Sequence, residues 1–222
     1  MHRSGTSCLA GSLQQAGLHL GDVHTANPFN RRGNREHPRV MALNDAVLAA
    51  NGGRWDNPAL ALHWGPALRA ERAAVLEELV PAQGPWGFKD PRTVFTLPFW
   101  QEAVPAWKFA GTYRHPAAVA RSLAHRNRFS HARGLALWRE YNQRLLTLAR
   151  RYAVPLIRFD QAPEAYRADL VGLLQHLGLE PAAADFFQPE LRNHDDAEPI
   201  AVDAASMRVF AALEEHGHAL GS

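Results

Sequence analysis

Apolar residues recur at helical spacing along most of the chain. Between positions 38 and 51, for example, Val40, Leu43 and Val47 stand three or four residues apart, and two glycines follow. Such spacing places apolar side chains on one face of a helix, and glycine is common just beyond a helix end. The same criteria predict seven helices, over residues 6–17, 38–51, 66–79, 116–126, 134–152, 163–177 and 203–216.

Three short apolar runs fit β-strands instead, over residues 86–88, 107–113 and 154–159. Strands that alternate with helices indicate a parallel sheet covered by helices, in which ligands bind beyond the carboxyl ends of the strands. Lys89-Asp90-Pro91-Arg92 and Arg114-His115-Pro116 follow the first two runs directly. We therefore predict one α/β domain over residues 1–222, with a short parallel sheet flanked by helices and a polar site at its edge.

The composition excludes several classes of protein. With 46% hydrophobic and 21% charged residues, the chain is neither disordered nor collagen-like. Its longest apolar stretches, such as 46–50, are far shorter than the roughly 20 residues that cross a bilayer, and no secretory signal opens the chain. The single cysteine, Cys8, cannot form an internal disulfide, which fits a reducing compartment. We expect a cytoplasmic protein without a transmembrane segment.

The charge pattern bears on possible partners. Only two of the 24 basic residues are lysines, Lys89 and Lys108, and 22 acidic residues are mixed among the arginines, so the net charge is +2. No continuous basic stripe results, and we do not expect nucleic acid as a partner.

The first candidate site is Arg3-Ser4-Gly5-Thr6-Ser7, at the start of a predicted helix. A cation, a permissive glycine and backbone N–H groups at a helix N-terminus favour an anion. An ordinary capped helix is the alternative interpretation. The segment is not a Walker A loop, because it lacks the lysine of that motif. Such turns normally follow a buried strand, so the sequence predicts a fold that lacks its first strand, with a truncated start or a free loop.

The second candidate site is Arg114 with Ser122, in the segment from Arg114 to Leu123. Arg114 ends a predicted strand and Ser122 lies two turns into the next helix, so both can reach one phosphate from the sheet edge. A surface cation and an unremarkable helix position form the alternative interpretation.

Together, the two segments resemble the sulfotransferases that use 3'-phosphoadenosine 5'-phosphosulfate (PAPS), and in particular their bacterial and tyrosylprotein-like branch. Arg3-Ser4-Gly5-Thr6-Ser7 matches the loop that holds the 5'-phosphosulfate, and Arg114 and Ser122 have the spacing of the 3'-phosphate pair. The segment 86–92 resembles the Lys-Asp-Pro segment of that branch. The resemblance is strongest over 1–179, whereas 190–222 is a C-terminal tail and helix.

The resemblance implies a fold like that of the P-loop-containing nucleoside triphosphate hydrolases and transfer of a sulfuryl group from PAPS, without a metal. Arg3 and Lys89 would stabilise the leaving phosphate, and Glu36 matches the catalytic carboxylate of the tyrosylprotein-like branch. His37 and Asp90 are alternative bases, and a helix-dipole partner is another interpretation of Glu36. Beyond Pro189 the resemblance fades.

Other residues leave alternatives open. Arg192 could contact the nucleotide or lie in a solvated tail, and His194-Asp195-Asp196 and His216-Gly217-His218 lack the spacing of a zinc site. Trp55, Trp64 and Trp100 either line an acceptor pocket or belong to the core. The acceptor, whether carbohydrate, peptide, lipid or metabolite, is not predicted. The rival functions are a truncated, non-catalytic nucleotide-binding or interaction module of the same fold and a P-loop kinase or NTPase.

Overall fold

Two short parallel strands form the sheet, β1 (Gly111–Tyr113) and β2 (Leu156–Arg158), with Gly111 opposite Leu156 and Tyr113 opposite Arg158. The structure is a computed structural model that describes residues 1–222 except 28–29, 31, 60, 182–185, 190–198 and 221–222. Eight helices accompany the two strands in the described part of the chain, so the protein has an α/β architecture.

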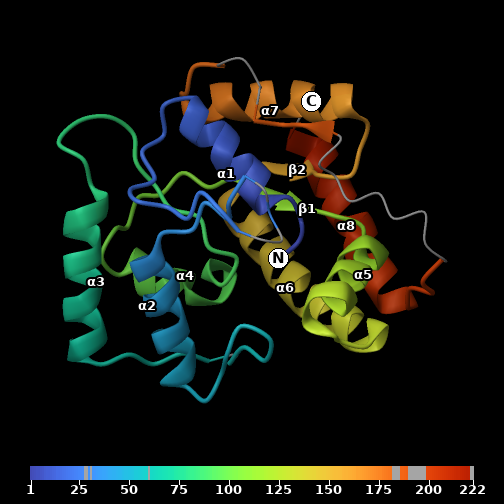
Figure 1. The fold of residues 1–222 in the computed structure, drawn as a ribbon, viewed down its shortest axis with the longest axis horizontal. Helices are drawn as coiled ribbons and strands as arrows, with labels where there is room; N and C mark the ends of the chain where they lie inside the picture. The colour runs from blue at the N-terminus through green and yellow to red at the C-terminus, as the bar shows by residue number, and fades with distance from the viewer. Residues whose placement is uncertain (28–29, 31, 60, 182–185, 190–198, 221–222) are drawn as a thin grey trace.

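Helices cover both faces of this sheet (Figure 1). On one face, Ile157 of β2 packs against apolar residues of α1 (Thr6–Gln15) and α7 (Pro163–Leu177). On the other face, Leu156 packs with residues of α5 (Pro116–Asn127), α6 (His131–Tyr152) and α8 (Ala204–Leu220). Neighbouring residues of a strand point to opposite faces, so two strands suffice to join these helical layers.

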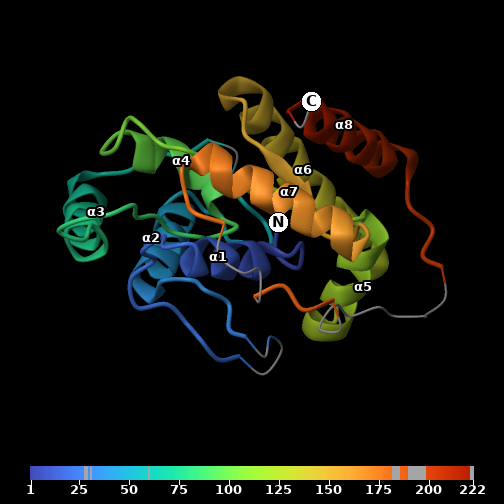
Figure 2. The same cartoon turned by 90° about the horizontal axis from the view of Figure 1, so that it is seen from above.

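A third apolar cluster forms at the end of the molecule away from α5 and α8 (Figure 2). It joins α2 (Pro38–Ala49), α3 (Pro66–Leu79) and α4 (Thr93–Gln101). Inside it, the Asn44 Oδ1 atom accepts hydrogen bonds from the Thr96 hydroxyl at 2.7 Å and the Trp100 indole at 2.8 Å. A buried amide that is bonded in this way fixes α2 against α4.

All seven predicted helices are present, with ends that shift by up to four residues. One helix, α4, was not predicted. Its sequence, TVFTLPFWQ, is apolar on nearly all sides, so it shows no helical periodicity. It also contains Pro98, and proline is unusual inside a helix.

The strand predictions need correction. Residues 86–88 form no strand: Trp86 makes a single parallel bridge with His19, through the Gly87 N–H and the Pro85 carbonyl. The aromatic side chains of Trp86 and Phe88 instead pack on Trp107. Of the strand predicted over 107–113, only the last three residues, 111–113, pair with β2. Of the strand predicted over 154–159, only the central residues, 156–158, pair with β1.

The start of the chain is packed against β1. Met1 is buried, and the Thr112 hydroxyl donates a 3.0 Å hydrogen bond to the Ser4 carbonyl. The predicted loop is therefore not free. Gly111 and Tyr113 direct their backbone bonds to β2. The described residues provide no further strand beside β1, and Gly111 and Thr112 of β1 line an apolar cavity of about 510 Å³.

Among the described residues, no helix combines the length and the apolar character needed to cross a membrane.

Candidate functional site

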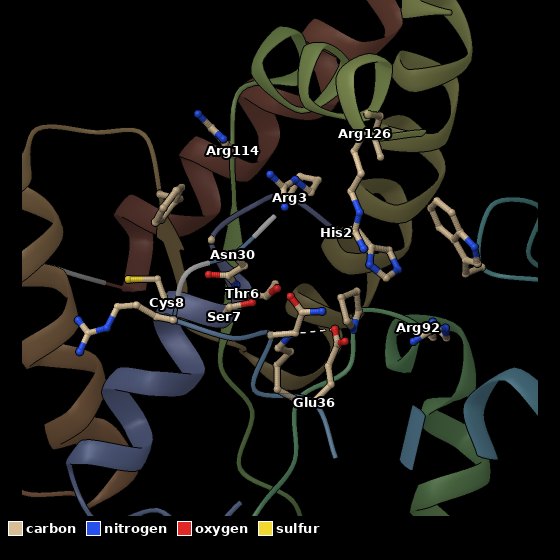
Figure 3. Close-up of a pocket in the computed structure, with 18 of the residues that line it drawn as sticks. His2, Arg3, Thr6, Ser7, Cys8, Asn30, Glu36, Arg92, Arg114 and Arg126 are labelled. Carbon is tan, nitrogen blue, oxygen red and sulfur yellow. Dashed lines mark hydrogen bonds and ion pairs between the residues drawn. The ribbon is translucent and has the colours of Figure 1, made fainter. Parts of the chain in front are cut away.

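A second cavity, of about 710 Å³, opens at the N-terminus of α1, beyond the carboxyl ends of the strands (Figure 3). This is the edge where ligands of parallel sheets bind. Its described lining contains one carboxylate, Glu36, and six cations: Arg3, Arg32, Lys89, Arg92, Arg114 and Arg126. We refer to it as the charged cavity.

The loop before α1 has the backbone that an anion site needs. Arg3 and Gly5 both have left-handed backbone angles, with φ of 64° and 81°. Gly5 caps α1, and a β-carbon there would collide with the ring of Phe159, so glycine is required. Thr6 and Ser7, in the first turn, line the charged cavity, and the helix N-terminus faces it.

Arg3 and Ser122 are in direct contact, although 119 residues separate them. The Arg3 Nε–H donates a 2.7 Å hydrogen bond to the Ser122 hydroxyl. Burial, followed by the charges of Arg126 and Arg114, lowers the pKa of Arg3 to about 10. The two predicted halves of the site are therefore joined in space, and three arginines lie close enough to act on one another.

Arg114 lies just beyond β1, as predicted. Its carbonyl accepts a 3.0 Å hydrogen bond from the Trp138 indole, and its guanidinium lies over the Phe159 ring at 5.6 Å. Next to it, the His115 N–H donates to the Asp160 carboxylate at 3.0 Å. Residues that follow both strands thus hold one another at the sheet edge.

Lys89 and Glu36 form a buried ion pair across the cavity from Arg3. The Lys89 Nζ atom lies 2.9 Å from the Glu36 Oε1 atom. Burial lowers the pKa of Lys89, and the charge of Glu36 opposes that shift. Both side chains line the charged cavity, so an ammonium and a carboxylate are placed together at its wall.

The other two candidate bases face elsewhere. The His37 Nε2 atom pairs with Glu78 at 3.2 Å. Asp90 accepts hydrogen bonds of 2.9 and 3.0 Å from the Arg92 guanidinium. Burial raises the pKa of Asp90 to about 6, and the charge of Arg92 opposes that shift. Neither His37 nor Asp90 is among the described residues that line the charged cavity, whereas Glu36 is.

The remaining predicted binding residues are placed unevenly. The Ser4 side chain is buried and, like Ser122, is not among the described residues lining the charged cavity. Of the three tryptophans, only Trp55 lines it. Trp64 donates to Glu102 at 2.8 Å, and Trp100 is fully buried in the core.

Several cavity residues were not predicted from the sequence. They are His2, Asn30, Arg32, Asn34, Arg126 and three phenylalanines, Phe159, Phe186 and Phe187. Two of them carried a usable signal. His2 adjoins Arg3 in the sequence. Arg126 follows Ser122 by one helical turn, so Ser122 and Arg126 lie on the same face of α5.

In the part of the chain that the structure describes, no three His, Cys, Asp or Glu side chains are grouped to hold a metal ion. Arg192 and His194-Asp195-Asp196 lie outside the described residues. The His216 Nε2 atom is hydrogen-bonded to the Val154 carbonyl at 2.9 Å.

Neither the family models, nor the curated proteins, nor the solved structures gave a match to this chain.

Proposed function

We propose that the protein is a PAPS-dependent sulfotransferase, which moves a sulfuryl group to a hydroxyl or amine and releases adenosine 3',5'-bisphosphate (PAP). The contact between Arg3 and Ser122 carries the proposal, because it unites two motifs that resemble the same family, and Arg3 lines the charged cavity. Arg114, the third motif residue, lines that cavity and acts electrostatically on Arg3.

The charge of the cavity supports a polyanionic ligand. PAPS carries a phosphosulfate and a separate phosphate, and the described lining offers six cations against one carboxylate. Guanidinium groups bind phosphate through charge-assisted hydrogen bonds, and the N-terminus of α1 adds backbone donors. Of the three phenylalanines of the cavity, Phe186 and Phe187 are buried, whereas Phe159 is partly exposed and is the ring on which a purine could stack.

The reaction needs geometry and charge stabilisation more than covalent help from the protein. The acceptor oxygen or nitrogen forms a bond to sulfur, while the bond from sulfur to the 5'-phosphate oxygen breaks. The electron pair of that bond leaves on the phosphate. Arg3 and Lys89 would stabilise this developing charge, since both line the cavity wall.

Glu36 is the proposed base. It would take the proton that the acceptor loses, since of the three candidate bases it alone is among the described residues lining the cavity. In the free protein its carboxylate is bonded to Lys89. A leaving phosphate that draws the Lys89 ammonium toward itself would release Glu36 for this role.

Thermal unfolding with PAP, and separately with ATP and Mg²⁺, tests the nucleotide assignment. PAP at about 100 times its dissociation constant should add roughly 2.7 kcal/mol to the stability, or several degrees in Tm. ATP with Mg²⁺ should leave Tm unchanged. A shift with ATP and Mg²⁺ alone would favour a P-loop kinase or NTPase and refute the proposal.

Catalysis is tested separately with radiolabelled PAPS and a set of hydroxyl and amine acceptors. The proposal predicts transfer of the label to at least one acceptor class. PAP binding without any transfer of label would favour the non-catalytic nucleotide-binding module.

A further inference from the structure

His2 is a partly buried titratable group that the proposed reaction does not use. Its ring makes edge contacts with the Trp55 ring, at 5.1 Å between centroids, and with the Tyr141 ring, at 5.8 Å. The Nε2 atom is buried and has no hydrogen-bond partner. His2 lines the charged cavity together with Arg3 and Arg126, so this unsatisfied nitrogen belongs to a residue of the cavity wall (Figure 3).

The surroundings of His2 keep its ring neutral in the free protein. Burial lowers its pKa well below 6.5, and the charges of Arg92, the Met1 amine, Lys89 and Arg126 lower it further. The Met1 amine is itself desolvated, with its pKa lowered to about 5. Two of these cations are paired with carboxylates, Lys89 with Glu36 and Arg92 with Asp90.

A bound polyanion would reverse this balance. It would place negative charge among the same cations that now disfavour an imidazolium, and an opposite charge within about 4–6 Å favours the charged form of a group. A buried nitrogen that lacks a partner gains most from such a ligand, since leaving a buried polar atom unsatisfied is costly.

Resting on the proposed function, we propose that His2 is a nucleotide-binding residue that takes up a proton when the nucleotide binds. The proton comes from solvent, and the imidazolium Nε2–H then donates a hydrogen bond to an anionic oxygen of the nucleotide. One N–H bond forms on the ring as the solvent or buffer acid releases the proton, and no other covalent bond changes. His2 thereby adds one positive charge to the cavity only when an anion occupies it.

This coupling makes nucleotide affinity depend on pH. By linkage, a ligand whose binding is accompanied by uptake of one proton binds up to about tenfold more tightly for each unit that the pH falls. The range lies between the pKa values of His2 in the free and bound protein. PAP, the released product, would dissociate faster at the upper end of this range.

Calorimetric titration of PAP tests the proposal without any acceptor. Binding heats measured at one pH near 6.5, in two buffers of different ionisation enthalpy, give the number of protons taken up. The full wild-type chain should take up more protons than the His2→Gln variant, in which a neutral amide replaces the ring. Equal uptake by the two proteins would overturn the proposal.

The comparison cancels other sources of protons. The Met1 amine and the PAP phosphates are present in both proteins, so only the difference in uptake reports on His2. His63→Gln, which removes an exposed histidine outside the lining of the cavity, should keep the wild-type uptake.

A second measurement avoids dependence on the folding of the variant. In wild-type protein with isotope-labelled histidine, the His2 ring signals should move from the neutral to the protonated form when PAP is added near pH 6.5. PAP that binds, as shown by a raised Tm, but leaves those signals neutral would refute the role of His2 alone. PAP that leaves Tm unchanged would refute the proposed nucleotide site, and the role of His2 with it.

Discussion

Two cavities meet at the start of α1, and they differ in volume and in the polarity of the side chains that line them. Thr6, Lys89 and Pro91 line both of them. The charged cavity, of about 710 Å³, is lined by ion-paired and hydrogen-bonded side chains. The apolar cavity, of about 510 Å³, is lined by residues such as Leu13 and Leu97, and it borders β1.

The two cavities differ in what holds their walls in place. Charged side chains hold their positions through specific bonds, whereas the apolar wall depends on close packing, which a neighbouring cavity weakens. The loop is therefore fixed by polar contacts on one side and loosely packed on the other. Changes to the charged cavity should affect ligands, and changes to the apolar cavity should affect the free energy of unfolding.

The largest expected effect is on turnover. Glu36→Gln should reduce it by roughly 10²- to 10⁴-fold, the usual range for loss of a general base, with PAP affinity nearly intact. Transfer of label from PAPS and calorimetric titration of PAP give the two quantities. Glu71→Gln, at an exposed carboxylate bonded to Arg39, should leave both unchanged. Normal turnover in the Glu36 variant would dismiss Glu36 as the base.

Truncation of core side chains should lower the free energy of unfolding most on the well-packed side of the sheet. Leu213→Ala, at a fully buried residue of α8, should lower the free energy of unfolding by about 2–5 kcal/mol. Leu97→Ala should cost less, because Leu97 already borders the apolar cavity and has fewer contacts to lose. Urea unfolding of both variants measures the difference, and equal losses would contradict the contrast between the two sides.

Nucleotide affinity should depend on Arg114. Its replacement by alanine should weaken PAP binding roughly 10- to 100-fold, the effect of losing a charge-assisted hydrogen bond of about 1.5–3 kcal/mol. Titration calorimetry measures the change. Arg151→Ala, at an exposed residue in the last turn of α6, is the matched control and should bind PAP normally. An unaltered affinity in the Arg114 variant would place the phosphate elsewhere.

Burial of the Met1 amine should also make the free protein less stable in mild acid. The folded chain keeps the Met1 amine neutral down to about pH 5, whereas the unfolded chain protonates it below about 8. The unfolded state therefore binds more protons in this range. The free energy of unfolding should decrease by up to about 1.4 kcal/mol for each unit by which the pH is lowered. Urea unfolding between pH 8 and 6.5 checks the slope. N-terminal acetylation should flatten it, and an unchanged slope would assign it to other groups.

The smallest effect should be a gain in stability. Gly87 borders the apolar cavity, and a β-carbon there would meet only the Leu18 side chain, at 3.6 Å or more. Gly87→Ala should therefore stabilise the protein by about 0.4–1 kcal/mol, since alanine restricts the unfolded chain. Thermal unfolding would show a slightly raised Tm. A lowered Tm would mean that the backbone at this position does not tolerate a side chain.

Local patterns predicted the helices well and the sheet less well. Amphipathic spacing depends on a segment's own residues, and segments such as 66–79 match α3 to the residue. A strand needs a partner that no local pattern names. Residues 86–88 have an apolar, aromatic sequence, but among the described residues only His19 pairs with them. Pro98 hid α4, since packing against α2 and α6 holds a helix that its own sequence disfavours.

The motif residues of the candidate site could be selected from the sequence, whereas its surroundings could not. Arg3 was selected from the loop that opens the chain and Ser122 from its spacing to Arg114, and the structure brings Arg3 and Ser122 into contact. The fold brings His2 and Arg126 into the same cavity, and the protonation of His2 depends on burial and on the charge of Arg126. His37 and Asp90 show the converse, since adjacency to Glu36 and Lys89 in sequence did not put them in the cavity.

The bond between Arg3 and Ser122 joins the two motifs before any ligand binds. In that bond the Ser122 hydroxyl accepts a hydrogen bond from the Arg3 Nε–H, so its own O–H can still donate to an anion. The Arg3 guanidinium likewise carries further N–H groups besides Nε–H. A phosphate could therefore accept hydrogen bonds from both side chains without breaking the bond between them. The pair is preorganised in this sense, and binding would have to order fewer side-chain conformations than if the two residues were apart.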